Sequence, residues 1–194
     1  MGDYEAKGYY QEEDAALAYE SQNRSSIGLR NLQAKRVGWG EERAFTRLLN
    51  RVPNHGRVLD IACGTERYME TMLRRGYQVG GVDISSEMLA FAKRRIRHHP
   101  NLLLLQGADA ERLRFKESQF DVITCMRLYH CVPPLPRSQM LQEVKRLGNA
   151  ILELLHHEPL RWQLVANCDA ASRRFNDRAA LDNLSNELVE VSDK

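Results

Sequence analysis

The stretch Arg57-Val58-Leu59-Asp60-Ile61-Ala62-Cys63-Gly64-Thr65 decides the fold of this chain. A short apolar run ends in an acid and a turn of small residues, and a helix-like segment follows. A second run of this kind ends at Asp83, nineteen residues after Gly64. Open α/β sheets bind nucleotides at the carboxyl ends of their strands, where small residues let the backbone approach a ligand closely. The pattern therefore predicts a nucleotide pocket in which Asp83 accepts the hydroxyl hydrogens of a ribose.

The residues after Gly64 exclude two common nucleotide sites. A dinucleotide turn needs the spacing G-x-G-x-x-G, whereas Gly64 is followed by Thr65-Glu66-Arg67-Tyr68. A P-loop is excluded as well, because no Gly-Lys-Ser/Thr follows a strand. Asp60 precedes Gly64 by four residues, where it repels a pyrophosphate but tolerates a ligand that carries positive charge. A nicotinamide oxidoreductase is therefore disfavoured.

Five segments in chain order resemble the motifs of class I S-adenosylmethionine-dependent methyltransferases. They are Val58-Leu59-Asp60-Ile61-Ala62-Cys63-Gly64-Thr65, Val82-Asp83-Ile84-Ser85-Ser86-Glu87-Met88-Leu89, Gly107-Ala108-Asp109-Ala110-Glu111-Arg112-Leu113-Arg114-Phe115, Phe120-Asp121-Val122-Ile123-Thr124-Cys125-Met126 and Met140-Leu141-Gln142-Glu143-Val144-Lys145-Arg146-Leu147. The resemblance runs from about Tyr19 to Leu155. It implies an α/β fold: a single Rossmann-like domain with a mostly parallel, doubly wound sheet and helices on both faces.

The resemblance also implies S-adenosylmethionine as the cofactor and a set of residues that hold it. The expected cofactor-binding residues are Asp60, Ala62, Cys63, Gly64, Asp83, Ile84, Met88, Asp109, Ala110 and Met126. Asp83 is expected to bind the ribose of the cofactor, and Asp109 and Ala110 its adenine. The surroundings of Asp60 are expected to hold the ammonium group. Met88 has a second interpretation as helix packing, and Asp109 as an ordinary loop acid.

The segment after the fourth expected strand faces the sulfonium in similar proteins, so we expect it to line the acceptor pocket. Tyr129 and His130 are the candidate catalytic residues, because either side chain can take a proton from an acceptor atom. Tyr19, Arg127 and His130 are the expected substrate-pocket residues. Structural packing is an equal alternative for His130 and for Tyr19. No metal site is expected, since adjacent histidines on a strand point in opposite directions.

Glu66 departs from the family pattern, which usually has glycine here, close to the methionine carboxylate. Two like charges about 5 Å apart cost about 3 kcal/mol at an effective dielectric of about 20. Rotation of Glu66 away from the site, or a pair with Arg67, would cancel most of that repulsion. The sequence therefore favours weakened binding of the cofactor over its exclusion.

Size and composition predict an ordinary soluble domain. The chain has 194 residues, 43% hydrophobic and 28% charged, with a net charge of +2. We expect residues 1–52 to form a helical segment that belongs to the domain and covers the cofactor pocket, and residues 53–194 to form the methyltransferase domain. The basic clusters at 94–99 and 173–174 are interpreted as solvated helix ends, so no nucleic-acid partner is expected. Scattered cysteines and the absence of a long apolar run predict a cytoplasmic protein without a membrane span.

Periodicity and turn residues predict the order of the elements. Helices are expected at 11–20, 39–51, 66–75, 85–99 and 138–147, and strands at 57–61, 78–82, 102–106, 120–125 and 150–155. The leucine run at 102–106 predicts a strand buried on both faces. Helical patterns at 160–175 and 178–184 precede a candidate strand at 187–191. No segment matches the family's antiparallel seventh strand, so an exposed sheet edge is expected, and a homodimer could cover it.

The sequence therefore predicts a methyltransferase that moves a methyl group from S-adenosylmethionine to a small-molecule acceptor by in-line displacement. The alternative is a non-catalytic binding protein of the same fold, with weakened or lost cofactor binding. Glu66 and the short carboxyl end are the two features that favour this alternative.

Overall fold

The computed structural model describes residues 13–24, 42–43, 45–50, 55–128, 131–157 and 161–165, together with Gly8 and Val52. The helices are α2 (Glu13–Arg24), α4 (Arg67–Arg74), α5 (Ser86–Ile96) and α6 (Pro134–Leu147). The strands are β1 (Arg57–Ile61), β2 (Gln78–Asp83), β3 (Leu102–Gly107), β4 (Phe120–Met126), β5 (Gly148–His157) and β6 (Arg161–Val165).

The strands form one sheet in the order β3-β2-β1-β4-β5-β6. The first five are parallel, and β6 runs antiparallel to β5. At the carboxyl end of β1, Ile61 lies opposite Val82 of β2 and Cys125 of β4. The tips of three neighbouring strands therefore meet at one edge of the sheet, where open α/β sheets bind their ligands. The predicted fold class is confirmed.

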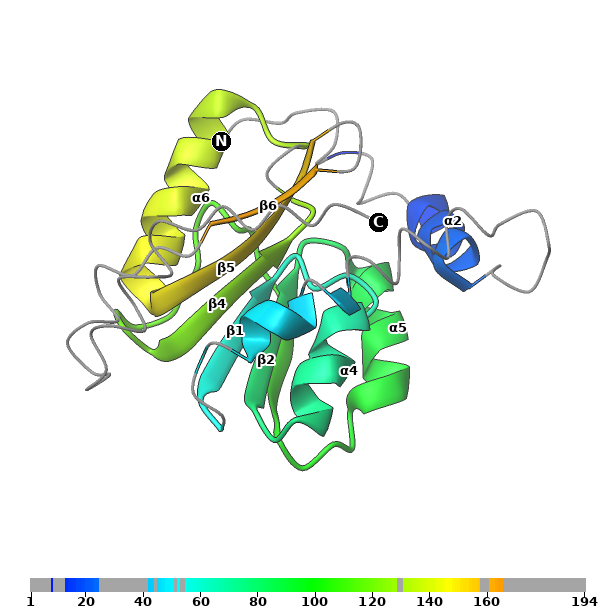
Figure 1. Ribbon diagram of the computed structural model, residues 1–194. Coiled ribbons are helices and arrows are strands. Elements are labelled where there is room, and N and C mark those ends of the chain that lie inside the picture. Colours follow the sequence, from blue (N-terminus) through cyan, green and yellow to red (C-terminus); the bar gives the residue numbers. More distant parts are fainter. Residues whose placement is uncertain are drawn as a thin grey trace.

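Helices cover the sheet on both faces, as Figure 1 shows: α4 and α5 lie against one face and α6 lies against the other. Apolar residues at helical spacing create each contact. In α4 the buried residues are Tyr68, Met69, Met72 and Leu73, and in α6 they are Met140, Val144 and Leu147. Two hydrophobic clusters result, one on each side of the sheet, and together they fix the strands that carry the site.

Two predicted helix ends are confirmed by their capping contacts. The Met88 amide donates to Ser85 Oγ at 3.2 Å, so Ser85 caps the start of α5. Gly76 ends α4 with a φ of +85°, a left-handed conformation that glycine adopts without strain. At the amino-terminal side, residues 42–43 and 45–49 are helical, within the expected helix at 39–51.

The prediction that strand 102–106 is buried on both faces is wrong. β3 lies at the edge of the sheet, its residues are only partly covered, and Leu103 is 39% exposed. The described residues 108–119, which lead from β3 to β4, contain no helix. A run of leucines does not by itself distinguish a central strand from an edge strand.

The prediction of a helix at 160–175 is wrong for residues 161–165, which form β6. This strand pairs with β5 from Glu153↔Val165 to His157↔Arg161. Its position, antiparallel beside the fifth strand, is the one for which the sequence offered no candidate. β5 therefore has a neighbour on its outer side, and β6 forms the edge of the described sheet at this end. A possible homodimer stays a prediction. The predicted elements at 178–184 and 187–191 lie outside the described residues.

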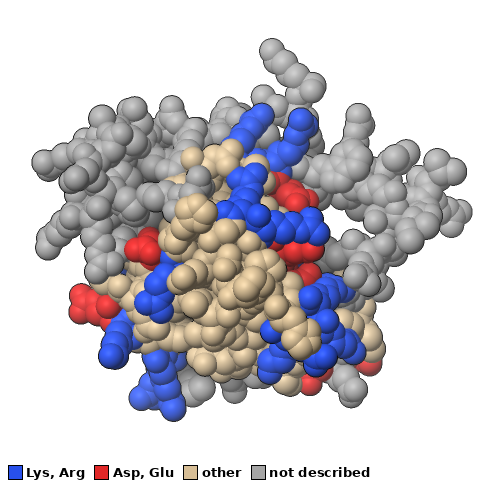
Figure 2. All heavy atoms as spheres, turned by 90° about the horizontal axis from the view of Figure 1, so that it is seen from below, with Lys and Arg blue, Asp and Glu red and all other residues tan. Residues whose placement is uncertain are grey.

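Other boundaries differ by a few residues. The last helix starts at Pro134, one turn earlier than expected, because proline fits the first turn of a helix. The fifth strand is longer than expected, at Gly148–His157. Within the described residues, no helix is long and apolar enough to cross a membrane. From below the sheet, in Figure 2, lysines and arginines lie among acidic residues around a mostly uncharged surface.

Candidate functional site

The loop after β1 is held in an unusual backbone conformation. Ala62, Gly64 and Glu66 all have positive φ angles, of 56°, 55° and 84°. Left-handed backbone costs a residue with a side chain about 1 kcal/mol, so the surroundings must hold the loop in place. The Cys63 amide does this in part by donating to the Val82 carbonyl at 3.0 Å. The turn of small residues is thereby attached to the tip of β2.

Asp83 joins this loop to the start of α5. Its Oδ2 accepts from the Gly64 amide at 2.8 Å, and its Oδ1 accepts from the Ser85 amide at 2.9 Å. The side chain is buried, and burial raises the pKa of Asp83, while the amide donors of Ser85 and Gly64 lower it. Each carboxylate oxygen has two lone pairs, so the carboxylate is fixed in orientation and still able to accept further hydrogen bonds.

A pocket opens at the tips of β1, β2 and β4. Its empty volume is about 920 Å³, a figure that includes open solvent at the mouth. The lining residues are Tyr19, Ile61, Ala62, Gly64, Val82, Asp83, Ile84, Met88, Ala108, Asp109, Ala110, Met126, Arg127, Leu128, Cys131 and Met140.

Ten residues that the sequence singled out line this pocket. Eight come from the expected cofactor set: Ala62, Gly64, Asp83, Ile84, Met88, Asp109, Ala110 and Met126. Tyr19 and Arg127 come from the expected substrate set. Asp60 and Cys63 lie behind the lining, where both are buried. Tyr129 and His130 lie outside the described residues, so their predicted role has no structural description.

Sequence reasoning missed six lining residues: Ile61, Val82, Ala108, Leu128, Cys131 and Met140. Two of them carried a usable signal, since Ile61 ends its strand and Val82 is the penultimate residue of the neighbouring one. Met140 belongs to α6, which follows β4 in the chain. Only the packing of this helix against the sheet brings Met140 to the pocket.

Asp60 lies beneath the pocket with half of its carboxylate unsatisfied. It is 1% exposed, Thr124 Oγ1 donates to its Oδ1 at 2.7 Å, and Oδ2 has no partner among the described atoms. Burial raises the pKa of Asp60 to about 7, against the lowering effect of Thr124 and with a smaller increase from the charge of Asp83. A buried acceptor of this kind favours a cationic group nearby.

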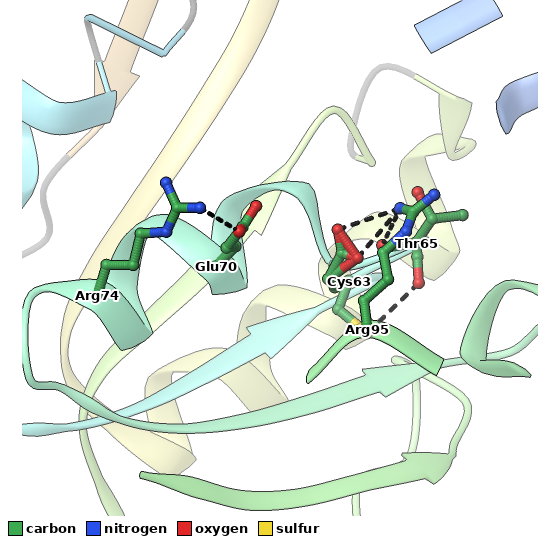
Figure 3. A network of polar contacts seen from close by, with 7 residues as sticks. Cys63, Thr65, Glu70, Arg74 and Arg95 are labelled. Carbon is green, nitrogen blue, oxygen red and sulfur yellow. Dashed lines mark hydrogen bonds and ion pairs between the residues drawn. The ribbon is translucent and has the colours of Figure 1, made fainter. Parts of the chain in front are cut away.

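Arg95 of α5 binds the carboxylate of Glu66, which is not among the residues that line the pocket. Arg95 Nη1 lies 3.1 Å from both carboxylate oxygens of Glu66, and it also donates to the Thr65 carbonyl at 3.2 Å (Figure 3). The Arg67 guanidinium lies 5.2 Å from the ring centroid of Tyr68. The pairing partner comes from 29 residues further along the chain, which no local pattern reveals.

The far side of the pocket is mostly apolar, with one cation. Met126, Leu128, Cys131 and Met140 line it together with Arg127, which directly follows β4. Arg127 has a φ of +62°. Burial raises the pKa of Cys131, and the charge of Arg127 lowers it by a smaller amount.

On the opposite side of the mouth, Tyr19 projects from α2 over the loop after β1. A Cβ placed on Gly64 would lie 3.9 Å from Tyr19 Cε1. In the part of the chain that the structure describes, no cluster of three or more His, Cys, Asp or Glu side chains could hold a metal ion.

Comparison with known proteins agrees with this geometry. Residues 58–149 match the model of a methyltransferase domain. YqeM of Bacillus subtilis, provisionally named a methyltransferase, is 36% identical over 72 residues, which are 37% of this chain and 29% of that protein. A ubiquinone biosynthesis O-methyltransferase of Cronobacter sakazakii is 32% identical over 113 residues, 56% of this chain and 46% of that protein. The chain thus spans less than half the length of these curated relatives.

A solved structure, a SAM-dependent methyltransferase from Methanosarcina mazei, has a TM-score of 0.51 and 25% identity, covering 55% of both chains. The sheet order, the pocket at the strand tips and the matched motifs converge on one conclusion. Residues 58–149 of this chain match a methyltransferase domain, and the chain is similar there to S-adenosylmethionine-dependent methyltransferases.

Proposed function

We propose that this chain binds S-adenosylmethionine in the pocket at the strand tips and transfers its methyl group to a small-molecule acceptor. The observation that carries the proposal is Asp83, whose carboxylate lines the pocket and is fixed by the Gly64 and Ser85 amides. Such an acceptor suits the two neighbouring hydroxyls of a ribose. Hydrogen bonds to a charged acceptor stabilise by about 1.5–3 kcal/mol each.

The remaining lining residues suit the other parts of the cofactor. Asp109 and Ala110 provide polar groups for the adenine, and Ile84 and Met88 provide apolar contacts to its two faces. The unsatisfied Oδ2 of Asp60 supports an ammonium group at the methionine end. These residues fit the cofactor that the family uses.

When bound, the sulfonium supplies a methyl group that is already activated for displacement. The protein's task is then to align an acceptor in line with it and to exclude water. The apolar wall of Met126, Leu128 and Met140 suits both tasks. Tyr129 and His130 remain our candidates for the groups that take a proton from the acceptor.

The second candidate function, a binding protein without activity, was suggested by Glu66. Its ion pair with Arg95 weakens that argument, because the carboxylate is occupied on α5 and its charge is compensated. Catalysis by this chain is therefore the better-supported proposal.

The test is to incubate the protein with S-adenosylmethionine and a panel of small phenols, amines and thiols, and to measure S-adenosylhomocysteine by mass spectrometry. We expect acceptor-dependent product above the cofactor-only background, and a loss of at least tenfold in Asp83→Ala at limiting cofactor. Binding of both nucleosides without product from any acceptor class would favour the non-catalytic alternative.

A further inference from the structure

The acceptor end of the pocket combines an apolar wall with one positive charge. Among the described residues that line the pocket, Arg127 is the one with a cationic side chain, and Met126, Leu128, Cys131 and Met140 line the pocket with it. Of the two acids in this lining, Asp83 ends β2 and Asp109 follows β3. The charges of the pocket are thus divided between two ends.

The order of the strands separates these ends. β1 lies between β2 and β4, and neighbouring strands are about 4.8 Å apart, so the tips of β2 and β4 are roughly 10 Å apart. The acids therefore lie on the side where the ribose and adenine are proposed to bind. Arg127 lies across β1, on the side left for the acceptor.

The backbone at Arg127 is strained. Its φ of +62° is one that residues with a side chain rarely adopt, and backbone strain of this kind is concentrated at functional sites. The backbone leaves β4 in this conformation directly after Met126, the last residue of the strand.

We propose that Arg127 is a specificity-determining residue that selects acceptors with a carboxylate on an apolar, flat body. This inference rests on the proposed function. The apolar wall suits a ring or hydrocarbon, and the planar guanidinium binds a carboxylate through two parallel hydrogen bonds. Among the described lining residues Arg127 is the one cation, and one guanidinium balances the charge of a monoanion but not that of a phosphate dianion.

The test uses the protein saturated with S-adenosylhomocysteine and three matched probes: 3,4-dihydroxybenzoate, the neutral 3,4-dihydroxybenzamide and 3,4-dihydroxyphenyl phosphate. Their binding is measured by calorimetry at pH 7.5. We expect the benzoate to bind roughly ten- to a hundredfold more tightly than the benzamide, the factor that one charge-assisted pair provides. We expect the phosphate to bind no more tightly than the benzoate.

The variants assign that preference to one side chain. Arg127→Gln keeps a polar side chain but removes the charge, and should abolish the preference for the benzoate, whereas Arg127→Lys should keep part of it. Arg114→Gln, an exposed arginine outside the lining, is the matched control and should behave as the wild type does. Circular dichroism of each variant confirms folding.

The inference is overturned if the benzoate shows no advantage over the benzamide, including the case in which neither binds. It is equally overturned if Arg127→Gln keeps the preference, or if the phosphate binds most tightly. The titration of the protein with S-adenosylhomocysteine tests the proposed function separately. Absence of S-adenosylhomocysteine binding contradicts the methyltransferase proposal, while an Arg127-dependent preference in the nucleoside-free protein would still support the carboxylate subsite.

Discussion

The ion pair between Arg95 and Glu66 gives the sharpest test of how this site tolerates an acid at its glycine position. Only 6% of the Glu66 side chain and 26% of the Arg95 side chain are exposed. Replacement by Arg95→Met keeps the apolar stem of the side chain and removes the charge. The buried carboxylate of Glu66 then loses its contact with the Arg95 guanidinium. Removing one partner of a fully buried pair costs about 3–5 kcal/mol, and the partial exposure of Arg95 lowers our expectation to about 2–3 kcal/mol.

The assay is equilibrium unfolding in urea at pH 7.5 and low salt. With a slope of about 2 kcal/mol per molar urea, the midpoint of Arg95→Met should fall by about 1–1.5 M. The matched control is Arg74→Met. Arg74 pairs with Glu70 at 2.6 Å, but these side chains are 74% and 49% exposed (Figure 3), so the loss should stay below about 0.5 kcal/mol. Equal small losses in both variants would refute the reasoning.

A double variant separates the ion pair from other effects of Arg95. Glu66→Gly removes the buried charge and also relieves the positive φ of 84°. In the Glu66→Gly background, Arg95→Met should therefore cost much less than in the wild type, by at least about 1 kcal/mol. Free energies of unfolding that add within about 0.3 kcal/mol would show that the two side chains do not interact energetically.

Two further predictions concern the core beneath the site. The pKa of Asp60 is raised from 3.8 to about 7, so ligand-free wild type should lose up to about 4 kcal/mol of stability as pH rises from about 4 to 7. Asp60→Asn should lack this loss in urea unfolding followed from pH 4.5 to 8; an equally steep decline in the variant would contradict the assignment. Gly81→Ala should lower stability by about 1–3 kcal/mol, because the new Cβ lies 2.6 Å from Met69 Sδ in a packed core. Gly107→Ala meets nothing within 4 Å and should change the thermal midpoint little, so similar losses in both glycine variants would count against the packing argument.

The parts of the fold that local sequence encodes were predictable. β1 was predicted at its observed bounds, and β2 extends by one residue to Asp83. The cap at Ser85 and the helix end at Gly76 were also predictable, because each depends on a few adjacent residues with distinct chemistry. The placement of Asp83 beside Gly64 followed from the strand-turn-helix pattern.

What could not be predicted depends on contacts between distant segments. The partial exposure of Leu103 follows from the position of β3 at the sheet edge, which a run of leucines does not reveal. Over five residues, the apolar pattern of 161–165 fits the helical period as well as the strand period. Pairing with β5 decides that these residues form a strand. In the site, the Arg95–Glu66 pair and the contribution of Met140 come from helices that only the fold brings there.

The central claim is that the pocket at the strand tips binds a sulfonium nucleoside through the carboxylate of Asp83. Calorimetric titration with S-adenosylmethionine and S-adenosylhomocysteine, on the wild type and on Asp83→Ala, tests it directly. We expect both nucleosides to bind the wild type with one-to-one stoichiometry, and the alanine variant to bind at least tenfold more weakly. Absence of binding by the folded wild type, or equal affinity in Asp83→Ala, would contradict the account.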